Sequence, residues 1–327
     1  MRVLVTGSTG FLGKPTVKLL LEKGAEVIAF VRPTSNVDWL QSQNGVKIAT
    51  GYLTVGDSVL RESVNRATHI AHLAGGALAA KASDFATNNA GTTNALIDAM
   101  RTTQYPERFV FVSSLAARGP SPSKEVATPK TDDSPVTLYG KAKLVAEKEL
   151  EKLRNDTSVF ILRPPAIYGP GDFRMLGVYR AVAKGLVVPL PRDAKSTSFV
   201  YVDDCAAAIV SALDCPDSKE PHYVEDGVPR TTQEIIATIG SALGTSPKLV
   251  RVPRSILSVA ATVSEGWGKL RRQPAFFTRD KVLEMTQGHW LCESSAFRSL
   301  TNWTPSISFT DGVKRAAEAY RADGLLP

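Results

Sequence analysis

Two patterns of hydrophobic and polar residues alternate through the first half of the chain. Short apolar runs of strand length are followed by longer segments with helical periodicity. The runs that we predict to be strands are Arg2–Thr6, Glu26–Val31, Val46–Thr50, Ile70–Leu73, Arg108–Ser113 and Val159–Arg163. The segments that we predict to be helices are Phe11–Lys23, Asp84–Arg101 and Leu138–Leu153. This order predicts an α/β fold, a doubly wound parallel sheet covered by helices on both faces.

The regular order ends at Arg163. Proline and glycine then become frequent, at Pro164-Pro165, at Gly169-Pro170-Gly171 and within Val188–Ser196. These residues interrupt strands and helices, so we predict that the chain leaves the sheet here. Phe199–Val202 is predicted to be a strand that returns to it.

A helix is predicted next, over Cys205–Leu213, with Asp203 or Asp204 as its N-cap. The remainder of the chain is expected to form a smaller lobe. The expected larger domain comprises residues 1–168 and 199–226, and the smaller C-terminal lobe comprises residues 169–198 and 227–327.

Composition is that of an ordinary globular protein. The chain has 327 residues, of which 43% are hydrophobic and 22% are charged. Its three cysteines are scattered and odd in number, which argues against a disulfide framework and favours a reducing compartment. The apolar runs are shorter than the ~18 residues of a membrane span, and a strand is predicted from Arg2 onward. We therefore expect a cytoplasmic protein without a membrane span.

The formal net charge is +7, and the excess lies late in the chain. The basic residues concerned are Lys248, Arg251, Arg254, Lys269, Arg271, Arg272, Arg279 and Lys281. We interpret them as a solvated face of the smaller lobe. Two alternatives are an anionic substrate and loose contact with a membrane surface. A nucleic-acid partner is not expected, because stacking aromatic residues are not interleaved with these charges.

A glycine-rich turn follows the first strand. Gly7, Gly10 and Gly13 recur every third residue, directly before a predicted helix. Gly7 permits a tight exit from the strand, Gly10 lets the backbone approach a phosphate, and Gly13 lets the helix pack closely on the sheet. The helix N-terminus then faces the phosphates. We predict a dinucleotide-binding turn that also includes Thr9, Phe11 and Leu12.

The residue after the second strand bears on the choice between NAD and NADP. An acidic residue there would bind the ribose 2′-hydroxyl, whereas an arginine would bind a 2′-phosphate. The chain has Arg32 at this position and no carboxylate between Ala29 and Asn36. We predict a preference for NADP.

A candidate proton-transfer group lies further along the chain. Tyr139 and Lys143 are four residues apart in a predicted helix and so share one face. A nearby ammonium favours the ionised phenol by roughly the ~2 pKa units that a tyrosine needs to work near neutral pH. Ser114, at the carboxyl end of a strand, could donate a hydrogen bond to a substrate oxygen. The predicted chemistry is hydride transfer coupled to proton transfer. His69 and His72 lie in an apolar run, and no metal site is expected.

These motifs recur together in a known family. The matching segments are Thr6–Gly13, His72–Gly75, Asn88–Thr92, Val112–Ser114, Tyr139–Lys143, Leu162–Pro165, Tyr168–Asp172, Phe199–Asp204, Trp303–Pro305 and Tyr320–Gly324. Over essentially its whole length the chain resembles the extended short-chain dehydrogenase/reductases, also called the NAD-dependent epimerase/dehydratase family. The resemblance implies a Rossmann fold with a C-terminal substrate lobe. Within this family, the chain most resembles the branches of 3β-hydroxysteroid dehydrogenase-like and dihydroflavonol reductase-like enzymes.

The resemblance also implies roles for individual residues. Ser114, Tyr139 and Lys143 would form the catalytic set, with Asn88 in support. The other residues expected to line the cofactor site are Leu53, Leu73, Ala74, Gly75, Ser113, Pro164, Ala166 and Ile167. Two departures from the family pattern are Tyr52, where an aspartate that reads adenine is usual, and Arg118, where a tyrosine is frequent.

The same resemblance narrows the reaction. Leu115 and Ala116 stand where dehydratases and decarboxylases of the family carry acids, so neither chemistry is expected. Ser196-Thr197-Ser198 stands where many sugar-nucleotide enzymes carry an arginine for the diphosphate. Apolar residues recur at helical spacing along Ile256–Leu270, which we predict to pack into the lobe's core; the alternative is a lid over a hydrophobic ketone.

Our leading hypothesis is an NADP(H)-dependent reductase of a hydrophobic ketone, or the corresponding alcohol dehydrogenase. A sugar-nucleotide epimerase and a non-catalytic, cofactor-binding regulatory subunit are the alternatives. We expect the partner to be a small molecule, hydrophobic or anionic, with a homodimer as the candidate assembly.

Overall fold

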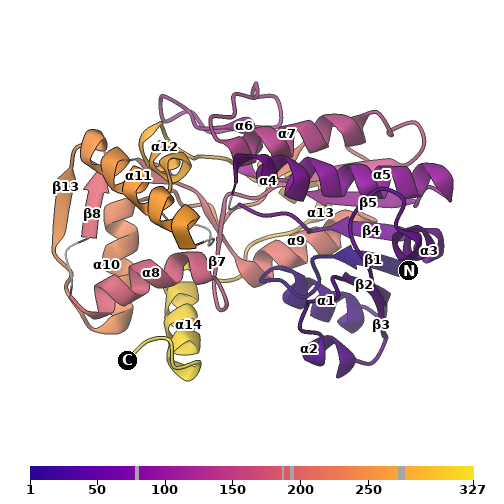
Figure 1. The fold of residues 1–327 in the computed structure, drawn as a ribbon, viewed down its shortest axis with the longest axis horizontal. Coiled ribbons are helices and arrows are strands. Elements are labelled where there is room, and N and C mark those ends of the chain that lie inside the picture. The colour runs from indigo at the N-terminus through magenta and orange to yellow at the C-terminus, as the bar shows by residue number, and fades with distance from the viewer. Residues whose placement is uncertain (78–80, 186–187, 192–194, 272–276) are drawn as a thin grey trace.

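Seven parallel strands form the main sheet (Figure 1). The computed structural model describes residues 1–77, 81–185, 188–191, 195–271 and 277–327. In spatial order the strands are β11 (His222–Tyr223), β6 (Ser158–Arg163), β5 (Arg108–Val112), β4 (His69–His72), β1 (Arg2–Thr6), β2 (Glu26–Val31) and β3 (Val46–Thr50). The predicted doubly wound α/β fold is confirmed.

Helices cover both faces of this sheet because successive side chains of each strand point to opposite sides. In β1, Leu4 contributes to one core and Val3 and Val5 to the other. The first face is covered by α3 (Ser58–Arg66), α5 (Thr92–Thr102) and α7 (Leu138–Glu151). The second is covered by α1 (Gly13–Glu22), α9 (Val202–Asp214) and α13 (Ser295–Thr301). Both faces are apolar, as strands buried on two sides require.

Two predicted helices differ from those observed. The segment predicted as one helix over Asp84–Arg101 is instead α4 (Ala82–Ala86), a π-helix over Thr87–Gly91 and then α5. Helix α1 begins at Gly13 rather than Phe11, because the preceding residues form a turn in which the Gly10 N–H donates to the Gly7 carbonyl at 3.0 Å. A short helix α2 (Asp38–Gln41) follows β2.

The predicted cap of α9 is wrong. Tyr201 occupies the N-cap position, and Asp203 and Asp204 lie in the first turn. The Asp204 carboxylate instead accepts hydrogen bonds from the backbone N–H groups of Ser306 and Ile307, at 2.9 and 3.1 Å. It therefore joins the start of α9 to the C-terminal segment, a long-range role that local sequence does not reveal.

The strand predicted to return to the sheet also has a different partner. It is β10 (Phe199–Tyr201), and it pairs in parallel with β7 (Ala166–Tyr168) in a separate two-stranded sheet. The main sheet is extended by β11 instead. The chain therefore crosses from the main sheet to the smaller lobe through a β7–β10 joint.

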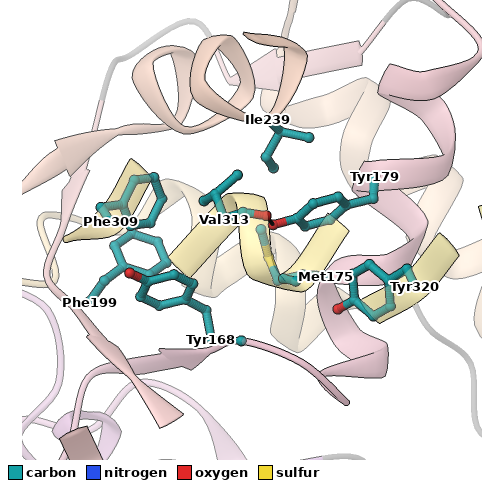
Figure 2. A pocket seen from close by; sticks show the side chains of 10 residues that line it. Tyr168, Met175, Tyr179, Phe199, Ile239, Phe309, Val313 and Tyr320 are labelled. Carbon is teal, nitrogen blue, oxygen red and sulfur yellow. Dashed lines mark hydrogen bonds between the residues drawn. The ribbon is translucent and has the colours of Figure 1, made fainter. Parts of the chain in front are cut away.

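The smaller lobe lies beside the sheet (Figure 1). Its elements are α8 (Phe173–Ala183), β8 (Val188–Pro191), β9 (Ser196–Thr197), β12 (Arg230–Thr231), α10 (Thr232–Leu243), β13 (Leu249–Val252), α11 (Arg254–Arg271), α12 (Arg279–Thr286) and α14 (Phe309–Ala322). Figure 2 shows the aromatic packing where this lobe meets the β7–β10 joint. Tyr168, Phe199 and Phe309 lie in mutual contact there. The space they leave is about 10 Å³, room for one water molecule at most, so this cluster is core rather than a ligand site.

The division into two lobes stays a prediction. The packing of α13 differs from the boundary that we expected. Phe297 of α13 is fully buried and contacts Phe160 and His222 of the main sheet. Trp303 packs beside it and donates its indole N–H to the Asp204 carbonyl at 3.0 Å. Residues around α13 therefore belong with the main sheet, although they fall within the expected lobe segment 227–327.

The apolar stripe of α11 also differs from its prediction. We expected a stripe of apolar residues to pack into the lobe's core, but its described members are exposed: Ile256, Val259, Ala260, Val263 and Trp267. The residues of α11 that pack inward are Leu257 and Ala261. The side chain of Leu270 is outside the described part of the structure. The predicted helix is present, and its exposed side carries more large apolar residues than its buried side.

Candidate active site

The glycine turn after β1 has the shape of a phosphate cradle. Gly7 has a φ of 73°, and a Cβ there would lie 3.0 Å from the backbone nitrogen of Ala74. A Cβ on Gly13 would collide with the Gly7 carbonyl oxygen. The turn therefore depends on glycine at both positions, and it leads directly into α1. Thr9 and Phe11 are half-buried within it. A dinucleotide pyrophosphate fits this arrangement of backbone and helix N-terminus.

The loop after β4 lies very close to Lys143, in the first half of α7. A Cβ on Gly75 would lie 2.7 Å from Asn89 Oδ1 and 3.0 Å from Lys143 Nζ. Leu73 and Ala74 are held by Thr6, through N–H hydrogen bonds of 3.3 Å to its carbonyl and 3.2 Å to its hydroxyl. The predicted cofactor residues Leu73, Ala74 and Gly75 therefore lie beside the glycine turn, next to Lys143.

His72, the last residue of β4, fixes the start of this loop. It is fully buried, with Nδ1 2.7 Å from the Thr6 hydroxyl and Nε2 3.1 Å from the Thr93 hydroxyl. Burial and the positive charge of Lys143 lower the pKa of His72 to about 3, so the ring stays neutral. Its role here is to join β1, β4 and α5.

Ser114 follows β5 and is the N-cap residue of α6 (Leu115–Arg118). Its hydroxyl oxygen accepts the Ala116 N–H at 3.1 Å. Because this bond uses an oxygen lone pair, the hydroxyl proton stays available for donation. The Leu115 N–H donates to the carbonyl of Pro164 at 2.9 Å, which ties the serine to the segment after β6.

Tyr139 and Lys143 lie on the first turns of α7. Thr137 caps that helix by accepting the Gly140 N–H at 3.0 Å. A Cβ on Gly140 would collide with the carbonyl oxygen of Ala116, so the glycine lets α6 and α7 touch and brings Tyr139 to Ser114. Lys143 Nζ donates to the Val112 carbonyl at 2.9 Å, at the end of β5.

The electrostatics of the pair differ from the prediction that Lys143 lowers the pKa of Tyr139, because burial is the largest effect. Burial raises the pKa of Tyr139, while the positive charge of Arg174 and a hydrogen bond with Ser114 oppose that rise. Burial lowers the pKa of Lys143 to about 8, against the opposing effect of the Glu147 carboxylate. At neutral pH the phenol therefore keeps its proton and the ammonium keeps its charge.

Ser113, predicted to line the cofactor site, turns its side chain the other way. Its buried hydroxyl donates to the Glu147 carboxylate. Glu147 is in turn paired with Arg163, whose guanidinium also bonds Asp133 at 2.6 and 3.0 Å. Burial raises the pKa of Glu147 and Arg163 opposes the rise. This buried ion network braces the ends of β5, β6 and α7, so Ser113 has a structural role.

The two neighbouring asparagines differ in burial. Asn88, predicted to support catalysis, is exposed, whereas Asn89 is buried. The Asn89 side chain bonds both backbone groups of Gly76, at 3.1 and 3.2 Å, and the Phe85 carbonyl at 2.9 Å. Both asparagines lie in the π-helix over Thr87–Gly91, and the supporting role of Asn88 stays a prediction.

Arg174 is a site residue that the sequence did not reveal. It lies on α8 and is held by Asp172 at 3.0 Å. It donates to the carbonyl of Ile167, a predicted cofactor-site residue, at 3.1 Å, and its positive charge lowers the pKa of Tyr139. Only folding brings the start of α8 to α7, so no local motif could have identified it.

The remaining residues that the sequence analysis singled out differ in burial. Arg32 is exposed just after β2, and within the described ranges no carboxylate forms an ion pair with it. Leu53 is half-buried, and the adjacent Tyr52 is 54% exposed. Arg118 is buried and donates to the Gly119 carbonyl at 3.2 Å. Ala166 lies in β7, beside the Ile167 carbonyl that Arg174 binds.

Comparison with known proteins agrees with this arrangement. Ceramide reductase of Caulobacter vibrioides is 29% identical to this chain, over 99% of the chain and 96% of that protein. UDP-glucose 4-epimerase of Vibrio cholerae is 28% identical, over 97% of the chain and 95% of that protein. The solved structure of UDP-glucose 4-epimerase of Thermus thermophilus with NAD superposes with a TM-score of 0.74 at 24% identity, covering 98% of this chain and 99% of that one, and so shares its fold.

Residues 3–225 match the family described as the NAD dependent epimerase/dehydratase family. This range contains the glycine turn, Ser114, Tyr139 and Lys143. The relatives include both reductases and sugar-nucleotide epimerases. The chain thus belongs to the NAD-dependent epimerase/dehydratase family of enzymes.

Proposed function

We propose that the protein is an NADP(H)-dependent reductase of a hydrophobic ketone, with Ser114, Tyr139 and Lys143 as its catalytic residues. The observation that supports this proposal is that the protonated, half-buried Tyr139 phenol is hydrogen-bonded to the Ser114 hydroxyl, close to Lys143 and the loop beside the glycine turn. Open α/β sheets bind ligands at the carboxyl ends of their strands, where these residues lie.

The three side chains have distinct tasks. The Ser114 hydroxyl donates a hydrogen bond to the carbonyl oxygen and polarises it. Tyr139 gives its proton to that oxygen as negative charge develops on it. The Lys143 ammonium favours the phenolate that remains. A reduced dinucleotide held by the glycine turn would supply the hydride.

Three observations favour simple reduction over the other reactions of the family. Leu115 and Ala116 carry no acid for eliminating water. Ser198, in the segment where sugar-nucleotide enzymes of the family often have an arginine, is buried and shares hydrogen bonds with Cys292. A relative named as a reductase spans 99% of the chain.

A sugar-nucleotide epimerase is the second candidate. The Vibrio cholerae relative supports it, because its identity to this chain is nearly as high. Epimerisation by transient oxidation would use the same three side chains but would regenerate its cofactor in every cycle. A non-catalytic regulatory subunit, the third candidate, has less support because Tyr139 and Lys143 are both present.

Tyr139→Phe removes the proposed proton donor. We expect turnover with a reducible ketone to fall by about 10²–10⁴-fold, while NADPH affinity stays near its original value. Rates are to be compared at saturating cofactor, with Tyr105→Phe, which lies before the amino end of β5, as the control. A Tyr139→Phe enzyme that retains more than about a tenth of the original rate would show that this phenol is not the donor.

Asn89→Ala and Asn88→Ala separate the two neighbouring asparagines. Asn89→Ala removes the hydrogen bonds that hold Gly76 and the Gly75 loop beside Lys143. We expect it to lower turnover about tenfold or more and stability by about 1–3 kcal/mol. Asn88→Ala should change both little, since its side chain is exposed. Steady-state rates and urea unfolding measure the two effects, and the reverse ranking would contradict the assignment.

Arg32→Ala tests the cofactor preference. Loss of a charge-assisted hydrogen bond to the 2′-phosphate costs about 1.5–3 kcal/mol, so NADPH affinity should fall about tenfold or more while NADH affinity is unchanged. Titration of both cofactors measures the difference, and Arg101→Ala is a control for loss of an exposed positive charge. Equal losses for the two cofactors, or a preference of the unaltered enzyme for NADH, would refute the NADP assignment.

A further inference from the structure

Helix α11 has two apolar faces, and only one of them is covered. Its inner face packs Leu257 and Ala261 against Val282 of α12. Its outer face, which we define as Ile256, Val259, Val263 and Trp267, is exposed to 57%, 65%, 68% and 56%. These four residues recur every three or four positions, so they form one stripe along the helix.

Such a stripe is unusual on a protein surface. Single exposed apolar residues are common, but contiguous apolar patches mark surfaces that bind a partner. The four residues lie on one uninterrupted helix, and α11 runs along the outside of the smaller lobe (Figure 1).

The charges around the stripe are almost all positive. Arg254 and Arg271 are exposed at the two ends of α11, and Arg251 is exposed on the preceding strand β13. The Arg271 guanidinium lies over the Trp267 ring, 4.7 Å from its centre. Glu265 is the single acidic residue of α11, and it is bound by Arg279 through hydrogen bonds of 2.7 and 3.0 Å. The outer face is therefore apolar with a basic rim.

We propose that the outer face of α11 binds an anionic lipid surface, with the helix lying parallel to it. Amphipathic helices that bind in this way place tryptophan and aliphatic residues at the acyl boundary and arginines among the headgroups. The inner face stays packed on the protein, so α11 lies on the surface and does not enter it lengthwise. No helix in the described ranges is both long and apolar enough to cross a membrane.

A second copy of the chain fits this surface less well. Antiparallel pairing of two α11 helices about a two-fold axis would place Arg254 of one copy near Arg271 of the other. Like charges would then face each other without acidic partners, because Glu265 already binds Arg279. Anionic headgroups satisfy the same arginines.

The outer face is connected to the active site through α12. Helix α12 packs on the inner face of α11, and its Asp280 accepts the N–H of Leu138 at 2.9 Å. Leu138 directly precedes Tyr139. A lipid-bound α11 would therefore hold the Tyr139 end of the site near the surface. The lipid-binding inference does not depend on the proposed reaction and is tested without substrate or cofactor.

Vesicle binding tests the proposal directly. The protein should sediment with vesicles of mixed phosphatidylcholine and phosphatidylglycerol, and less with phosphatidylcholine alone or at high salt. Bromine-labelled acyl chains should quench its tryptophan fluorescence. Val263→Asp should weaken binding about tenfold or more, since it places a carboxylate at the centre of the stripe.

Val55→Asp is the matched control, because Val55 is 66% exposed in the loop after β3. It should bind the mixed vesicles as the unaltered protein does. The proposal is overturned if the unaltered protein stays in the supernatant, or if Val263→Asp binds as well as Val55→Asp. A dimer that Val263→Asp dissociates, in a protein that ignores vesicles, would assign the outer face to a second copy.

Discussion

The buried ammonium group of Lys143 is the constraint on which the site depends. Its Nζ donates to the Val112 carbonyl at the end of β5 and lies beside Gly75 after β4. A buried charge is costly unless it is hydrogen-bonded, so these segments cannot move apart without a large loss of stability. Asn89 of the π-helix bonds Gly76 in the same loop, and His72 at the end of β4 bonds Thr93 of α5. The glycine turn, Ser114 and Tyr139 are thereby kept in one arrangement.

Much of the fold could be predicted because its signals are local. Strands β1, β2 and β3 have the predicted bounds, since apolar runs of that length are required where both faces of a sheet are covered. The glycine turn was visible because Gly7 and Gly13 meet demands of the backbone itself. Tyr139 and Lys143 were visible because four residues make one helical turn. The family comparison confirmed the family that these motifs resemble.

The rest depends on contacts between distant segments. A π-helix surrounds Asn88 and Asn89 and buries only Asn89, and helical periodicity does not predict a π-helix. Arg174 lies close enough to influence Tyr139 only in the folded chain, because the two residues belong to separate helices, α8 and α7. The periodicity of α11 showed an apolar side but not whether the protein covers it. The pairing of β10 with β7 likewise depends on where the smaller lobe joins the sheet.

The central claim is that hydride passes to a ketone carbon while Tyr139 supplies the proton, and isotope transfer tests it most directly. Purified enzyme is incubated with NADPH deuterated at the transferring position and a panel of long-chain aliphatic and steroidal ketones, with UDP-glucose in parallel. The account predicts a secondary alcohol with one deuterium on its carbinol carbon for each NADPH oxidised. Epimerisation of UDP-glucose without net NADPH oxidation, and without any deuterated alcohol, would contradict it.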